Sequence, residues 1–210
     1  MRYTLGLLLA FGLSATAPRL INFDTAPLGK TPPEWNVTMT NRGHWPQWEI
    51  VIDHTAPTQP YVFAQVAADR VGDRYPLAVL KDFKMGDGEV SVRVKPVSGH
   101  DYRSGGLVWH YRDENNYYLA RINALEKNVQ VFKVENGHRS PLMAPARHEV
   151  PTNDWTILKV AVKGPRFQIY VDHRRVLQGN DYTFKNPGGV GLWTVSDSVV
   201  YFDDFRIFPK

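Results

Sequence analysis

Hydrophobic and polar residues alternate with a period of two along much of the chain. In residues 89–95, three valines at even positions alternate with charged or hydroxyl residues, and residues 158–163 and 166–172 repeat the pattern. Such alternation is typical of β-strands that are buried on one face. The Gly164-Pro165 pair between the last two segments predicts a hairpin turn.

Turn-forming residues divide the rest of the chain into short segments of similar length. One or two helical turns are expected near residues 67–70, and no helical intervals separate the strands. This pattern predicts an all-β fold, an antiparallel two-sheet jelly-roll sandwich that spans residues 18–210 as one domain. The predicted strands are 20–23, 35–39, 48–52, 61–66, 77–81, 89–95, 105–112, 116–123, 128–134, 155–163, 166–172, 175–178, 190–194 and 199–208.

The N-terminus has the features of a targeting segment. Arg2 precedes an apolar stretch over residues 5–13, and small residues follow up to Ala17. This order predicts a secretory signal peptide over residues 1–17 and a secreted or periplasmic protein. The apolar stretch is shorter than the ~20 residues of a membrane-spanning helix, so no membrane span is expected. Pro18 would directly follow a cut after Ala17, a poor place for proline in a cleavage site, so the sequence does not determine the cleavage position.

Composition narrows the chemistry. The chain is 43% hydrophobic and 22% charged, with a net charge of +4 and no cysteine. These values are typical of a globular domain and exclude disulfide frameworks, iron–sulfur clusters and thiol nucleophiles. Phosphate-binding glycine loops and the serine-esterase motif are absent, and basic residues are dispersed, so no nucleic-acid partner is expected.

Residues 103–126 form a predicted hairpin and exit loop with many polar and aromatic side chains. Alternation places Arg121 and Asn123 on one face of the second strand, and Glu126 and Asn128 follow at the next turn. Planar hydrogen-bonding groups beside aromatic rings suit the hydroxyls and C–H faces of sugars. The alternative is an ordinary outer sheet face stabilised by cross-strand Arg–Glu pairs.

Aromatic residues complete this candidate binding surface. Trp45 precedes Pro46 and is therefore expected in a loop, where its ring could stack on a sugar. We also assign ligand contacts to Trp109, Tyr111 and Trp193. The alternative is that the tryptophans cover the edge of the core.

Acidic residues suggest one further site. No carboxylate pair has a spacing specific for glycoside hydrolysis. Asp203 and Asp204 are adjacent on the last strand, so one of them faces inward and, together with Asp24, could bind a structural calcium ion. A hydrogen-bonded structural aspartate is the alternative.

Three segments together resemble a known family. They are 105–118, 189–194 and 201–205, and they are similar to the 3-keto-disaccharide hydrolase-like domains of the concanavalin A-like lectin/glucanase superfamily. The resemblance implies a jelly-roll sandwich with the polar residues of 121–128 on its ligand-facing sheet. The E-x-D-x-x-E strand motif of family 16 glucanases is missing, since residues 49–53 do not match it.

Three functions remain open from the sequence. The first is an exported module that binds a carbohydrate or glycoconjugate. The second is a hydrolase or lyase for modified disaccharides, with Glu126 as general acid/base. The third is an envelope interaction domain without a small-molecule site. The sequence determines neither the glycan nor the oligomeric state.

Overall fold

The computed structural model describes residues 17–210 and consists of β-strands and connecting loops, so the predicted signal peptide lies almost entirely outside the described residues. No helix long and apolar enough to cross a membrane occurs within 17–210. The strands are β1 (Arg19–Ile21), β2 (Trp35–Thr40), β3 (Trp48–Ile52), β4 (Tyr61–Gln65), β5 (Tyr75–Leu80), β6 (Gly88–Ser98), β7 (Ser104–Asp113), β8 (Asn116–Asn123), β9 (Asn128–Glu135), β10 (His138–Pro141), β11 (Ala146–Arg147), β12 (Thr156–Lys163), β13 (Arg166–Val171), β14 (Arg174–Asn180), β15 (Gly189–Thr194) and β16 (Val199–Pro209).

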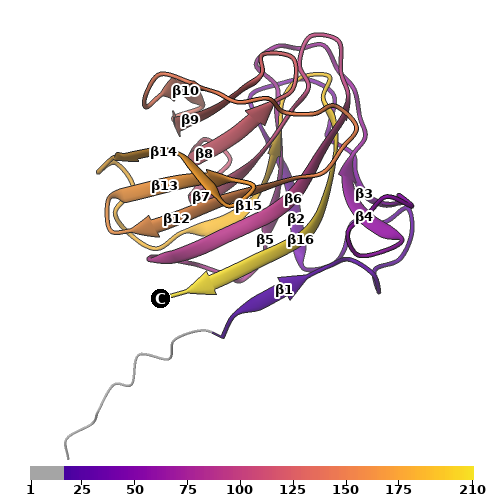
Figure 1. Cartoon of the computed structure of the whole chain (residues 1–210), viewed down its shortest axis with the longest axis horizontal. Coiled ribbons are helices and arrows are strands. Elements are labelled where there is room, and N and C mark those ends of the chain that lie inside the picture. Colours follow the sequence, from indigo (N-terminus) through magenta and orange to yellow (C-terminus); the bar gives the residue numbers. More distant parts are fainter. Residues whose placement is uncertain (1–16) are drawn as a thin grey trace, which may run out of the picture.

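The strands form two antiparallel sheets that face each other (Figure 1). Sheet A has the order β14-β13-β12-β6-β16-β4-β3, with β1 paired to β16. Sheet B has the order β10-β9-β8-β7-β15-β5-β2, with β11 paired to β9. The two-sheet sandwich predicted from the alternation is therefore confirmed.

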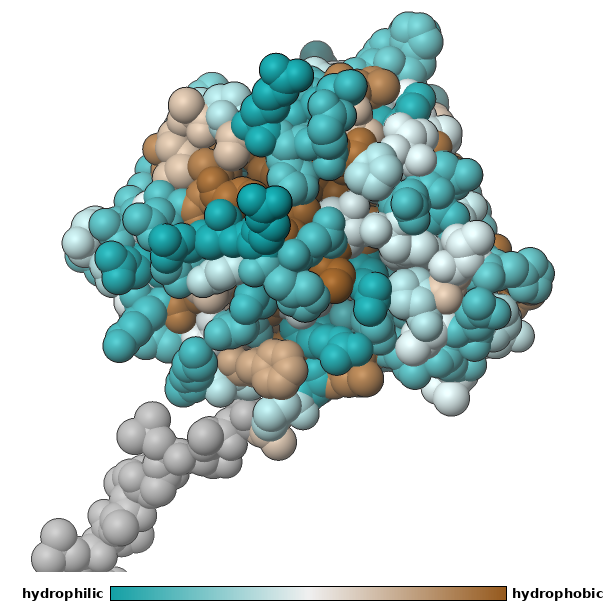
Figure 2. Space-filling model, in the orientation of Figure 1, coloured by the Kyte–Doolittle hydropathy of each residue, from teal (hydrophilic) through white to brown (hydrophobic). Residues whose placement is uncertain are grey.

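The main core lies between the sheets and takes the inward residue of each alternating pair. Leu158, Val160 and Val162 of β12 are buried there, while Lys159 between them points outward. Burying a side chain of this size stabilises the fold by roughly 1.5–3 kcal/mol. Hydrophilic residues cover most of the surface seen in Figure 2, and hydrophobic residues are visible in the recesses between them.

Two details differ from the sequence prediction. Strands β10 and β11 were not predicted, although Asn136 and Gly137 form a turn with positive φ angles of 52° and 78° before β10. The helical turns expected near residues 67–70 are wrong, because this segment has no regular structure. Its Asp69 carboxylate instead accepts the backbone N–H of His44 at 2.7 Å, which ties the segment to a distant loop.

Sheet B is buried on both of its faces. On β8, Tyr118 belongs to the main core, whereas Tyr117 and Leu119 belong to a second apolar cluster on the opposite face. The guanidinium carbon of Arg139 on β10 lies 4.7 Å from the ring centre of Tyr75 on β5. These strands are five positions apart in the sheet, about 24 Å if it were flat. Sheet B is therefore strongly curled, and we call its outward face the concave face.

Candidate functional site

Arg139 occupies the centre of the concave face. Its guanidinium carbon lies 4.7 Å from the ring centre of Tyr75, 4.8 Å from that of Phe132 and 5.7 Å from that of Trp193. The side chains of residues 17–210 include no hydrogen-bond or ion-pair partner of this guanidinium at bonding distance. Cation–π contacts of this kind fix the group without engaging its N–H donors. Arg139 is therefore a positioned cation with free donors.

A second arginine lies beside it and is engaged in a polar network. Arg121 Nη2 donates to Glu126 Oε2 at 2.7 Å, and Nη1 donates to Asn128 Oδ1 at 3.2 Å. Its guanidinium carbon lies 5.5 Å from the ring centre of Phe132, so Arg121 and Arg139 share this ring. We call Tyr75, Arg121, Glu126, Phe132 and Arg139 the concave-face cluster.

The turn after β8 orients Glu126. The Asn123 side-chain oxygen accepts the backbone N–H groups of Leu125 at 3.0 Å and Glu126 at 3.3 Å. Asn128 Nδ2 then donates to Glu126 Oε2 at 3.1 Å. Of the predicted ligand-binding residues, Asn123 is thus buried and shapes the turn, whereas Glu126 and Asn128 reach the surface of the cluster.

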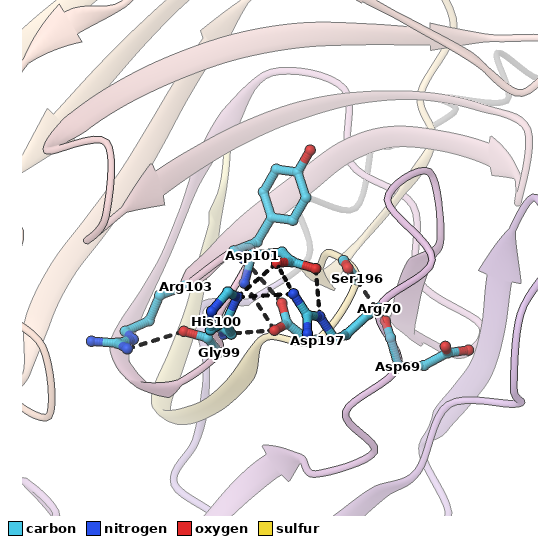
Figure 3. Close-up of polar contacts among 9 residues, drawn as sticks. Asp69, Arg70, Gly99, His100, Asp101, Arg103, Ser196 and Asp197 are labelled. Atoms are coloured by element: carbon cyan, nitrogen blue, oxygen red, sulfur yellow. Dashed lines mark hydrogen bonds and ion pairs between the residues drawn. The ribbon is translucent and has the colours of Figure 1, made fainter.

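The loop before β7 carries Tyr102 to the rim of the concave face, where it packs against the second apolar cluster. The Asp197 carboxylate accepts three successive backbone N–H groups, those of His100 at 2.6 Å, Asp101 at 2.9 Å and Tyr102 at 3.0 Å. Arg70 forms two hydrogen bonds to Asp101 on the same loop (Figure 3). The loop is therefore held rigidly at this end of the sandwich.

The charges of the cluster are fixed at neutral pH. Burial raises the pKa of Glu126, but the hydrogen bond and positive charge of Arg121 outweigh it and hold this pKa below its usual value. Burial raises the pKa of Tyr75, whose hydroxyl stays neutral. A general acid needs a raised pKa. Glu126 is therefore placed to accept hydrogen bonds, and its lowered pKa does not favour the acid part of the general acid/base role considered from the sequence.

The predicted aromatic residues are not brought together. The Trp109 ring is buried in the main core and stacks on Tyr118 with ring centres 5.3 Å apart. Trp193 is fully buried on the concave face beneath Arg139, and Tyr111 is half-buried at its edge. Trp45 is exposed on the loop between β2 and β3. The buried rings of Trp109 and Trp193 therefore offer no free face to a ligand. Alternation indicates which face of the sheet a side chain occupies, but it does not indicate how deeply that face is buried.

The predicted calcium ligands are engaged by other protein groups. Asn22 Nδ2 donates to Asp24 Oδ2 at 2.7 Å, and burial and the negative charge of Asp204 raise the pKa of Asp24. Asp203 accepts hydrogen bonds from the Thr58 backbone and hydroxyl at 2.9–3.0 Å, while Asp204 is paired with Arg93 and Arg206. Within residues 17–210, no three His, Cys, Asp or Glu side chains form a group that could hold a metal ion. The two guanidiniums already neutralise Asp204, and the ligand set does not fit calcium, which takes 6–8 oxygens.

Sequence reasoning missed several members of the cluster. Arg139 lies on β10, which was not predicted, and the rings of Tyr75 and Phe132 come from distant strands. The Asn136-Gly137 pair after a predicted strand is a hairpin signal and could have indicated β10. The contact between β10 and β5 depends on the curl of the sheet, for which the sequence has no local signal.

Two open hollows flank the cluster. One has a volume of about 410 Å³ and is lined by Tyr75, Arg139 and the β9–β10 turn. The other has a volume of about 350 Å³ and is lined by Glu126, Asn128 and Arg147. Arg139 and Glu126 of the cluster therefore each line an open hollow that could admit a ligand.

Comparison with known proteins gives a partial sequence relative. The chain is 32% identical over 107 residues to a levanase of Bacillus subtilis (strain 168). This match covers 50% of the chain and 15% of the levanase. No family model matches the chain, and the resemblance to 3-keto-disaccharide hydrolase-like domains has no support at the level of that family.

Solved structures share the fold. The carbohydrate-binding module CBM66 from Bacillus subtilis superposes with a TM-score of 0.63 at 24% identity, over 82% of this chain and 93% of the module. Domain 4 of the arabinanase AbnA from Geobacillus stearothermophilus, solved with arabinotriose, superposes with a TM-score of 0.56 at 15% identity, over 91% and 93%. At these identities the likeness establishes the jelly-roll sandwich fold.

Proposed function

We propose that this protein is a carbohydrate-binding module whose ligand contacts the concave-face cluster. The observation that carries the proposal is Arg139, which is held against three aromatic rings and forms no hydrogen bond or ion pair with a side chain of residues 17–210. A guanidinium in this state is preorganised to donate hydrogen bonds to a ligand.

The neighbouring groups add a hydrogen-bond acceptor and an aromatic ring for a sugar. Both hydrogen bonds to Glu126 end on Oε2, which leaves Oε1 to accept from a hydroxyl group. The carboxylate is 45% exposed, so a ligand can reach it. Tyr102 adds a half-exposed aromatic ring at the rim. Donors, an acceptor and apolar faces thus converge on one concave surface.

Fructans are the first carbohydrates to test. The partial relative is named a levanase, and its name concerns levan, a fructose polymer. The arabinotriose bound by the AbnA domain adds a second furanose sugar. We therefore choose levan oligosaccharides and arabinotriose as probes.

The experiment is a calorimetric titration of residues 18–210 with these probes. Arg139→Ala and Glu126→Gln are expected to weaken binding by about 10- to 100-fold, the loss of one charge-assisted hydrogen bond. Arg175→Ala is the matched control, since Arg175 is exposed on sheet A. Unchanged affinity in both cluster variants, with circular dichroism showing intact folds, contradicts the proposed site.

Export belongs to the same proposal. In residues 1–17, Arg2 is followed by an apolar stretch and then by small residues. This order supports a signal peptide and a secreted or periplasmic location. Expression of the full chain in a bacterial host, followed by fractionation and mass measurement, tests it. We expect a protein shortened near Ala17 outside the cytoplasm, and a full-length cytoplasmic product contradicts export.

A further inference from the structure

Trp45 is the most exposed large hydrophobic side chain of residues 17–210, with 66% of its surface accessible. It lies on the loop between β2 and β3, next to buried Pro46 and near buried Trp48. A tryptophan of this exposure directly before a buried proline is unusual, because the hydrophobic effect favours turning the ring inward.

The exposure does not come from a loosely held loop. The backbone N–H of His44 donates to Asp69 at 2.7 Å, and the fully buried Arg74 donates through Nε to the His44 carbonyl at 2.8 Å. Trp48 stacks on Phe202 with ring centres 5.6 Å apart. Both ends of the short segment that carries Trp45 are thus fixed, and its ring is presented to solvent by the fold.

Polar groups line a hollow beside the ring. The hollow has a volume of about 490 Å³ and includes Trp45, Lys30, Gln47 and Glu49 in its wall. Gln47 Nε2 donates to Glu49 Oε2 at 2.8 Å, which orients the carboxylate and leaves Gln47 Oε1 and Glu49 Oε1 without a bond to other side chains of residues 17–210. The Lys30 ammonium likewise has no side-chain partner there.

We propose that this hollow is a second sugar-binding site, in which a sugar ring stacks on Trp45 and its hydroxyl groups bind Lys30, Gln47 and Glu49. The charges of Lys30 and Glu49 cancel, which favours a neutral sugar over an anionic ligand. An apolar ring face beside open donors and acceptors matches the C–H face and hydroxyl edge of a sugar.

The second site is distinct from the concave-face cluster. Its wall comes from β2, β3 and the segment before β2, whereas the cluster comes mainly from β8, β9 and β10. Figure 1 shows β3 on the opposite side of the molecule from β9 and β10. A polysaccharide long enough to reach both places can therefore be contacted at two points.

Two sites change how the protein binds a polymer. Once one site is occupied, the second engages the same chain at a high effective concentration, and the apparent affinity rises without new contacts. This bivalency rests on the proposed function of the concave face, while the Trp45 site stands independently of it. Bivalency therefore predicts a difference between long and short ligands, whereas the Trp45 site alone predicts that levan covers the Trp45 ring.

The experiment compares Trp45→Ala with wild type on levan polymer and on a levan trisaccharide. We expect the variant to bind the polymer about tenfold more weakly and the trisaccharide within about twofold of wild type. Tyr182→Ala is the matched control, because Tyr182 is another exposed aromatic residue, 65% accessible. Acrylamide quenching of tryptophan fluorescence adds a direct readout, since levan should protect the exposed Trp45 ring.

The outcomes separate the two sites. Weaker polymer binding in Trp45→Ala but not in Tyr182→Ala, together with protection of wild-type Trp45 from acrylamide by levan, supports the second site. This holds even when Arg139→Ala binds like wild type, a result that contradicts only the concave-face proposal. Polymer affinity equal to wild type in Trp45→Ala, or no protection of wild-type Trp45 from acrylamide by levan, overturns the second site. An equal loss in Trp45→Ala and Tyr182→Ala also overturns it, because the effect is then not specific to the hollow.

Discussion

The outer faces of the two sheets have the same alternating sequence pattern, but one is exposed to solvent and the other is buried. On sheet A, Lys159 of β12 points outward, remains partly exposed and pairs with Glu89 of β6 at 3.1 Å. On sheet B, the outward residues Tyr117 and Leu119 of β8 are fully buried. One face is a solvated surface with exposed ion pairs, and the other is a second apolar core with two arginines at its opening.

The difference shows that curvature can bury an outer face and make it a second apolar core. Sheet B brings its strands close enough that a Cβ on Gly191 would meet the Ala78 carbonyl oxygen at 2.4 Å. The curl buries the apolar floor and carries Arg139 across it to Tyr75. On sheet A, the outward Lys159 and Glu89 stay in contact with solvent, where paired charges contribute little to stability.

The largest expected effect tests whether the concave face is a true core. Leu119→Ala should lower the free energy of unfolding by about 2–5 kcal/mol, similar to Leu158→Ala in the main core, because both side chains are fully buried. Urea unfolding measures both. A loss below about 1 kcal/mol for Leu119→Ala alone would show that the concave face is loosely packed.

The next largest effect concerns stability and comes from Asp203, a buried acid of sheet A. Burial raises the pKa of Asp203 from 3.8 to about 6, against the hydrogen bonds donated by Thr58. Between these values the folded state holds its proton more tightly than the unfolded state, so the stability that the protonated acid contributes is lost as pH rises from about 4 to 6. The loss is on the order of 1–3 kcal/mol.

Thermal unfolding of wild type and Asp203→Asn over pH 4–7 tests this prediction. The difference in stability, wild type minus variant, should fall between pH 4 and pH 6 and stay level above. A constant difference would show that Asp203 ionises in the folded protein as it does in the unfolded chain.

Arg139→Lys should produce a smaller effect, and it tests whether ligand binding needs the planar guanidinium on the concave face. Lysine keeps the charge near Tyr75 and Phe132 but loses the flat fork of donors. We expect ligand affinity to fall by about tenfold in calorimetry while the melting temperature stays within a few degrees. Wild-type affinity in this variant would indicate that charge alone binds the ligand.

The smallest effect is expected on sheet A. Lys159→Ala removes the ion pair with Glu89 and the contact of its ammonium with the Tyr170 ring at 4.4 Å. Since the pair is partly exposed, unfolding free energy should change by less than about 1 kcal/mol, and binding should not change. A loss comparable to that of Leu119→Ala would remove the contrast between the two outer faces.

Several features of the protein follow directly from the sequence. Period-2 alternation and turn residues predicted the sandwich. Neighbouring residues such as Tyr117 and Tyr118 lie on opposite faces because the side chains of a strand alternate whatever their surroundings. The polar character of residues 121–128 was also predicted, since it depends on residue type and a local turn.

The tertiary structure decided how exposed each face is and which distant residues meet. Trp109 and Trp193 were expected at a ligand surface but are buried, and the contacts of Arg139 with Tyr75 and Phe132 were not foreseen. Local patterns determine which way a side chain points. Whether that direction leads to solvent, to a core or to a ligand depends on sheet curl and long-range packing, which no short stretch of sequence encodes.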